Sequence, residues 1–192
     1  MKKNNLLASM AGKALALAAA MMMSMAFTAC SSDDDDTPAP QPEPTFTNTI
    51  VLDGVTMPII DAGIDEDDLN EGHYNIVLFV SENKGVKIMV DKAYHDGNTI
   101  DLTKKEPKHD GWYWSVECYN PNLIIDTYGE PGTSYPVFMS GTLSVKSLGS
   151  EDGKPVFEIV LKNGKVKGEG EYGDGKEHTI SISWKGKAKK IS

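Results

Sequence analysis

The chain has 192 residues, 28 acidic side chains against 19 basic ones, and two cysteines. This length fits one domain or two small ones, and two cysteines are too few for a disulfide-stapled miniprotein. All the basic side chains are lysines. The acidic chain therefore lacks the guanidinium groups that grip phosphates in pairs, and we expect no nucleic-acid partner.

The first 29 residues have the pattern of a signal peptide. Lys2 and Lys3 give a basic start, and the run from Ala14 to Phe27 is apolar except for Ser24. A membrane-spanning helix needs about 20 apolar residues, so this run is too short to span a bilayer. Its length is typical of the core of a signal peptide.

The end of this segment predicts a lipid anchor. Phe27-Thr28-Ala29-Cys30 resembles the lipobox of bacterial lipoproteins, in which a bulky apolar residue and two small ones precede a cysteine. The resemblance implies that the Cys30 thiol carries a diacylglyceryl group and that cleavage removes residues 1–29. Each buried methylene contributes about 0.8 kcal/mol, so two or three acyl chains anchor a protein durably.

Residues 30–45 are predicted to form an acidic, proline-rich tether. The run from Ser31 to Asp36 resembles the surface-export signal of lipoproteins from the Bacteroidota group. That resemblance implies display on the outer face of the outer membrane, although a solvated tether also explains the aspartates. From Pro38 to Pro44 every second residue is proline, which favours an extended, stiff spacer.

Residues 46–192 alternate between apolar and polar side chains and contain many turn dipeptides, a pattern that predicts an antiparallel β-domain. Asp53-Gly54 predicts a two-residue turn that pairs Leu52 with Val55. A second hairpin is expected between the strands His73–Ser81 and Val86–Asp91. The strand from Tyr74 to Val80 is apolar on both faces, so its outer side needs a cover.

One short helix is expected over Asp65–Glu71, because its acidic start suits the N-terminal end of a helix. No other segment has a convincing helical period.

The dipeptide Asn163-Gly164 predicts a third hairpin, which pairs Leu161 with Val166. In that register Gly168 and Gly170 lie on the inner face among large apolar residues. Small residues between large ones let a strongly curved sheet close, so this pattern favours a barrel.

We therefore predict an all-β fold, an antiparallel meander closing into a barrel, with at most one short helix. A two-sheet β-sandwich is the alternative. The segments Ser140–Val145 and Ile180–Gly186 resemble the small lipocalin-like β-domains of Bacteroidota surface lipoproteins. The resemblance implies anchoring and binding rather than chemistry.

No pattern in the chain indicates a catalytic residue, a metal site or a cofactor. The four histidines are isolated in the sequence, without the paired spacing of zinc ligands. The segment Gly168–Gly173 matches the dinucleotide-binding glycine pattern, but a predicted strand follows it where that site needs a helix. Cys118 is expected to be a buried, inert thiol.

Aromatic residues indicate the candidate ligand site. Trp112 and Trp114 share a predicted strand, while Tyr128 and Tyr135 lie in a loop rich in glycine and proline. If the tryptophans point inward, they belong to the core. If they line the mouth of a barrel, the four side chains form a binding site, because aromatic faces stack on sugar rings and planar ligands.

These patterns together predict a lipid-anchored, non-enzymatic protein of the outer membrane, exposed at the cell surface, whose β-domain binds a small molecule or a glycan. Two alternatives stay open. One is a structural or adhesive module of an outer-membrane assembly, which contacts a protein partner through the two-sided apolar hairpin of His73–Ser81 and Val86–Asp91. The other is a hydrolase whose site the sequence does not reveal.

Overall fold

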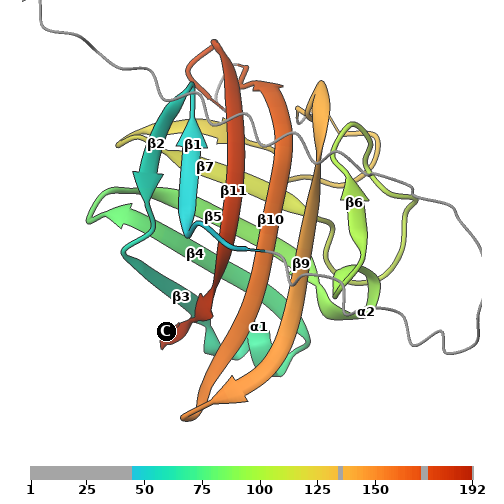
Figure 1. Ribbon diagram of the computed structural model, residues 1–192. Coiled ribbons are helices and arrows are strands. Elements are labelled where there is room, and N and C mark those ends of the chain that lie inside the picture. The colour runs from blue at the N-terminus through green and yellow to red at the C-terminus, as the bar shows by residue number, and fades with distance from the viewer. Residues whose placement is uncertain (1–44, 134–135, 170–172, 192) are drawn as a thin grey trace, which may run out of the picture. The chain divides into compact units, whose positions relative to one another are not determined.

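Strands make up most of the described domain (Figure 1). The computed structural model describes residues 45–133, 136–169 and 173–191, all of which belong to one compact unit, Glu43–Ser192. The all-β prediction is confirmed for these residues. The predicted signal peptide, the lipidation residue Cys30, nearly all of the tether and Tyr135 lie outside them.

Two six-stranded sheets form the domain. The first sheet has the order β2-β1-β11-β10-β9-β6. Its strands are β1 (Thr49–Leu52), β2 (Val55–Pro58), β6 (Thr99–Asp101), β9 (Ser140–Glu151), β10 (Lys154–Lys167) and β11 (Glu177–Lys187). The second sheet has the order β12-β3-β4-β5-β7-β8. Its strands are β3 (Asp61–Asp65), β4 (His73–Ser81), β5 (Lys84–Asp91), β7 (Ser115–Tyr119), β8 (Leu123–Asp126) and β12 (Lys189–Ile191).

The sheets lie face to face, and the long strands β9, β10 and β11 run across the direction of β4, β5 and β7 (Figure 1). Neighbouring strands are antiparallel except at one edge, where β12 runs parallel to β3. Only Ala188 separates β11 in the first sheet from β12 in the second, so the chain turns a corner there. The backbone N–H of Ala188 donates to the carbonyl of Pro155. This bond holds the corner against the first sheet.

The core fills the space between the sheets. Alternate residues of β4 (Tyr74, Ile76 and Leu78) are buried and face buried side chains of the first sheet such as Phe157. The rings of Tyr74 and Phe157 meet edge to face, with centroids 5.0 Å apart. Period-two burial on both sheets therefore gives one shared apolar layer.

Two predicted hairpins are confirmed. Leu52 pairs with Val55 across the Asp53-Gly54 turn, where both turn residues have a positive φ. Strands β4 and β5 pair along their length, from His73 opposite Asp91 to Ser81 opposite Lys84.

The third predicted hairpin is wrong. Asn163-Gly164 does not reverse the chain, because β10 continues through it to Lys167 with a bulge against both neighbouring strands. Asn163 has a positive φ, which suits some bulges as well as a turn. A Cβ on Gly164 would lie 2.8 Å from the carbonyl oxygen of Ile180 and 2.7 Å from Leu161 Cδ2, so glycine is required for close packing.

The predicted register of the two later glycines also fails. Ile182 pairs with Leu161 and Ile180 with Gly164, so the barrel argument based on Gly168 and Gly170 has no support. Gly168 is buried but lies beyond the end of β10, and Gly170 is outside the described residues.

Two short helices are present where the sequence predicted at most one. The predicted helix is α1 (Glu66–Asn70), whose N-cap Asp65 accepts hydrogen bonds from the N–H groups of Asp67 and Asp68. Asp68 in turn accepts a hydrogen bond from the Asn75 amide on the outer side of β4, so α1 covers part of that face. The second helix, α2 (Lys92–His95), is a single turn with Asp91 as its N-cap. Too few residues form it to give a helical period in the sequence.

None of the helices in the described ranges is long and apolar enough to cross a membrane.

Candidate ligand-binding site

The residues between β6 and β7 form a corner loop, Leu102–Trp114, with no regular structure. Both of its ends are anchored in the core, because Leu102 and Trp114 are almost completely buried. The N–H of Leu102 donates to Gly141, and its carbonyl accepts from Phe138. The segment between the two anchors is therefore held against the edge of the domain rather than free in solvent.

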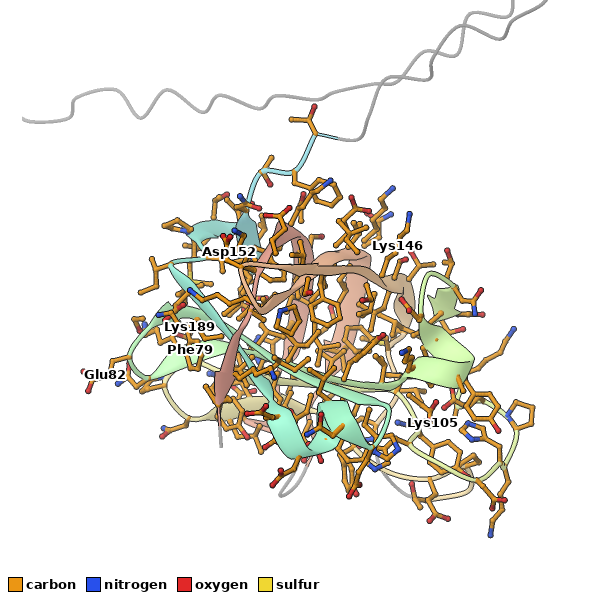
Figure 2. The ribbon with its side chains drawn as sticks, turned by 90° about the horizontal axis from the view of Figure 1, so that it is seen from below. Phe79, Glu82, Lys105, Lys146, Asp152 and Lys189 are labelled. Carbon is orange, nitrogen blue, oxygen red and sulfur yellow. The ribbon has the colours of Figure 1, made fainter. Side chains whose placement is uncertain are left out.

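Lys105 fixes the loop from inside. Its ammonium group donates to the backbone carbonyls of Trp114 and Thr127 and lies 4.2 Å from the centroid of the Trp114 ring. Burial lowers the pKa of Lys105 to about 8. Figure 2 shows Lys105 among the loops on the opposite side of the domain from Phe79 and Glu82.

Glu106 lies between two histidines. His95 Nε2 is 3.0 Å from one carboxylate oxygen, and His109 Nε2 is 3.3 Å from the other. Burial would raise the pKa of Glu106, but the hydrogen bonds and charges of the histidines outweigh it, so the pKa is lowered. This histidine–glutamate cluster (His95, Glu106 and His109) joins α2 to the corner loop.

Each histidine of the cluster has a second partner besides Glu106. The Asp91 backbone N–H donates to His95 Nδ1 over 2.8 Å, and the same nitrogen lies 3.0 Å from the Asp91 carbonyl. His109 Nδ1 lies 2.7 Å from the Asp110 carbonyl, and its Nε2 faces Glu106. Both ring nitrogens of His109 therefore face acceptors, and these contacts raise the pKa of His109.

A third histidine supports the other end of the loop. The rings of His73 and Trp112 stack with centroids 4.2 Å apart and an angle of 11° between their planes. The backbone N–H of Trp112 donates to Asp91 Oδ2, which also lies 3.7 Å from His73 Nε2. Asp91 therefore caps α2 and holds the backbone of the loop at Trp112.

Two hollows flank the corner loop. We call the larger one, about 500 Å³, the cationic pocket; its lining includes Tyr94, Asp101, Lys104, Lys105, Glu106, Lys108, His109 and Trp114. We call the smaller one, about 350 Å³, the aromatic pocket; it is lined by Gly111, Trp112, Tyr113, Tyr128, Gly129, Glu130 and Thr133. The two volumes are of the size that small ligands occupy.

The structure separates the predicted ligand residues. Trp112 and Tyr128 line the aromatic pocket together, Trp112 half-buried and Tyr128 53% exposed. Trp114 is only 1% exposed and packs beside Phe138, so it is chiefly a core residue that forms part of the floor of the cationic pocket. The tryptophans do not share a strand, because β7 begins only at Ser115.

Sequence reasoning missed the histidine–glutamate cluster. The four histidines are isolated along the chain, but His73, His95 and His109 all lie around Asp91, Glu106 and the corner loop. One feature of the sequence could have indicated the cluster. The segment from Lys104 to Trp114 is rich in lysine, histidine and aromatic residues and has no alternation of apolar and polar side chains. Among the described residues, no three histidine, cysteine or acidic side chains are arranged to hold a metal ion.

The remaining histidine lies in a different ion-pair cluster. His178 is buried, with Nδ1 2.8 Å from Asp53 and Nε2 2.9 Å from Asp174. Burial alone would lower the pKa of His178, but the two carboxylates outweigh it and the pKa is raised. This cluster ties the β1–β2 turn to the segment before β11, and neither pocket includes it.

Cys118 is the one cysteine among the described residues, and it is buried and unpaired in the core. Burial raises the pKa of its thiol to about 12, so the thiolate is scarcely populated at neutral pH.

No family model matches this chain, and neither a curated protein nor a solved structure does.

Proposed function

We propose that this protein is a lipid-anchored surface protein of the outer membrane whose β-domain binds a glycan or another small ring-shaped ligand in the aromatic pocket. The observation that carries the proposal is the meeting of Trp112, Tyr113 and Tyr128 around one hollow of about 350 Å³. Aromatic faces stack on sugar rings, and Glu130 and Thr133 add polar groups that can bind hydroxyls.

The rigid support of the pocket strengthens this proposal. Trp112 is stacked on His73, and the Tyr113 hydroxyl donates to the His109 carbonyl. Aromatic side chains that are fixed before the ligand arrives lose little conformational freedom on binding.

The carboxylates of the larger hollow are bonded within the protein. Asp101 is bonded to Thr103 and paired with Lys104, and Glu106 is held by two histidines. Their role in this proposal is to hold the corner loop that supports the aromatic pocket.

Binding assays on the full-length chain test the proposal. We expect a glycan or small-molecule array to give hits, and Trp112→Ala and Tyr128→Ala each to weaken the best hit at least tenfold. Tyr119→Ala removes another part-exposed tyrosine, at the end of β7, and serves as the matched control. Hits that bind Trp112→Ala as well as the unchanged protein would contradict the proposal.

The membrane anchor has a separate test. Cys30→Ala removes the thiol that the lipobox resemblance assigns to lipidation, so the variant should leave the membrane fraction. A variant that stays in the membrane fraction would overturn the proposed anchor.

For the fold, we propose a partly open barrel of the lipocalin-like kind. Two connections between the sheets support it: the corner at Ala188, and a single bridge from Ile125 in β8 to Gly173, which follows β10. A two-sheet sandwich agrees with the same sheets equally well.

A second candidate function is the adhesive module, on a different surface from the hairpin that the sequence indicated, because β4 and β5 lie inside the second sheet. Val55 on the edge strand β2 is 61% exposed, and Ile60, just after it, is 65% exposed. Apolar side chains beside an unpaired strand edge favour contact with another protein. Loss of self-association or partner capture in Val55→Lys would identify that surface.

A further inference from the structure

The cationic pocket is positively charged in a domain that is acidic. From Phe46 onward the sequence has 23 acidic side chains against 16 lysines. The pocket is nevertheless lined by three lysines and His109, against only Asp101 and Glu106.

Both carboxylates of the pocket already have cationic partners. Glu106 is matched by His109, whose two ring nitrogens both face acceptors. The hydrogen bond to the Asp110 carbonyl and the bond to Glu106 together raise the pKa of His109 against the effect of burial. Asp101 lies 3.2 Å from Lys104 Nζ.

Lys108 is the lysine of the pocket that the two carboxylates leave unpaired. It is exposed at the pocket, and no ion pair joins it to Asp101 or Glu106. Lys105 donates to the carbonyls of Trp114 and Thr127, and the charges of Glu106 and Asp126 act on it against the effect of burial. The ammonium group of Lys105 also packs on the Trp114 ring, so it keeps one position at the pocket.

The two pockets lie on either side of one pair of rings. Tyr113 lines the aromatic pocket and His109 lines the cationic pocket, and their ring centroids are 4.7 Å apart. A ligand that reaches across these two rings would contact both hollows.

We propose that the cationic pocket is the subsite for an anionic group of the ligand. The ligand is then an acidic glycan whose carboxylate or sulfate lies near Lys105 and Lys108 while a neighbouring sugar ring lies in the aromatic pocket. This inference rests on the proposed function, because it extends the same binding site.

The test uses matched pairs of glycans and the full-length chain. For carboxylates, the pair is an oligogalacturonate and its methyl ester; for sulfates, it is a sulfated galactan oligomer and its desulfated form. We expect the charged member of one pair to bind about tenfold more tightly at low salt, and this preference to shrink as ionic strength rises. The pair that shows the preference identifies the anionic group.

Lysine variants locate the subsite. Lys108→Gln should weaken the charged ligand about two- to fivefold and leave the uncharged partner unchanged. Lys154→Gln, at the start of β10, removes an exposed lysine away from the corner loop and should change neither.

The outcomes separate the two proposals. Equal binding of the charged and uncharged forms, with both weakened by Trp112→Ala, overturns the anionic subsite and leaves the aromatic site standing. A charge preference that Lys108→Gln leaves intact also overturns the subsite. Failure of every glycan and small molecule to bind overturns the proposed function and this inference together.

Discussion

The core between the two sheets and the corner loop each contain a tryptophan but use it differently. Trp114 is 1% exposed and packs in the apolar core, whereas Trp112, two residues earlier, is half-buried and lines a pocket. Between the sheets, side chains are fixed by packing against other apolar groups. In the loop, Trp112 is fixed by a histidine and a carboxylate. The comparison shows that a rigid aromatic side chain can be provided without burying it, which a binding site requires.

The largest expected effect separates the two tryptophans. Trp114→Ala leaves a cavity in the core and should lower the free energy of unfolding by about 3–5 kcal/mol. Trp112→Ala removes mainly the stacking on His73, for which we expect a loss of about 0.5–1.5 kcal/mol. Urea denaturation of both variants measures the difference. Equal losses would mean that the corner loop is packed like the core.

The next effect tests how closely the loop backbone approaches Asp91. A Cβ on Gly111 would lie 2.4 Å from Asp91 Oδ2, and Gly111 has a φ of +96°. Gly111→Ala should therefore lower stability by about 2–3 kcal/mol, from backbone strain and a steric clash together. Gly132→Ala is the matched control, because Gly132 has a φ of +82° but nothing within 4 Å of its added Cβ. A similar loss in both variants would exclude a specific contact with Asp91.

Glu106→Gln tests the histidine–glutamate cluster. The change replaces the carboxylate that contacts His95 and His109 by a neutral amide. We therefore expect the free energy of unfolding, measured by urea denaturation at pH 7, to fall by about 1–2 kcal/mol. The pKa of Glu106 is lowered in the folded protein. Its contribution is therefore present above its usual pKa of 4.5 and is lost as the pH falls through the folded value. A stability difference between the two proteins that persists at low pH would contradict this account.

The smallest effect concerns the His178 cluster, which has no pocket. The hydrogen bond from His178 lowers the pKa of Asp174 to about 2, so its contribution is present above 3.8 and is lost between pH 3.8 and 2. The pKa of His178 is raised, so its contribution is complete below 6.5 and is lost as the pH rises through the folded value. Asp174→Asn should therefore make the melting temperature depend less on pH in both ranges, below pH 3.8 and above pH 6.5. Asp174 is close to solvent. An unchanged dependence on pH in either range would show that solvent screens the pair of His178 and Asp174 there.

The sequence was sufficient to predict features that depend on neighbouring residues. Period-two alternation predicted the strands, Asp53-Gly54 predicted its turn, and the acidic run after Asp65 predicted α1. Asn163-Gly164 misled because its positive φ suits a bulge as well as a turn, and only the strands on either side of β10 decide between them. Tertiary contacts decide between a hairpin and a bulge, so the local sequence pattern alone does not predict which one forms.

The candidate site was predictable only in part for the same reason. Trp112 and Tyr128 were identified from residue type, because aromatic faces stack on sugar rings and planar ligands. The cluster of His95, Glu106 and His109 depends on α2 folding back on the corner loop, and no spacing in the sequence shows this. Trp112 lines a pocket while Trp114 is buried, and this difference depends on where β7 begins. The alternating pattern predicted too early a start for that strand.

The most direct test of the aromatic site follows the indole N–H signals of the three tryptophans during titration with the best-binding glycan. Trp114 and Trp184 are buried, while Trp112 lines the aromatic pocket. A Trp112→Phe variant assigns its signal. The account predicts that the Trp112 indole signal shifts in a saturable way while the Trp184 signal stays in place. Saturable binding that leaves the Trp112 signal unmoved would contradict it.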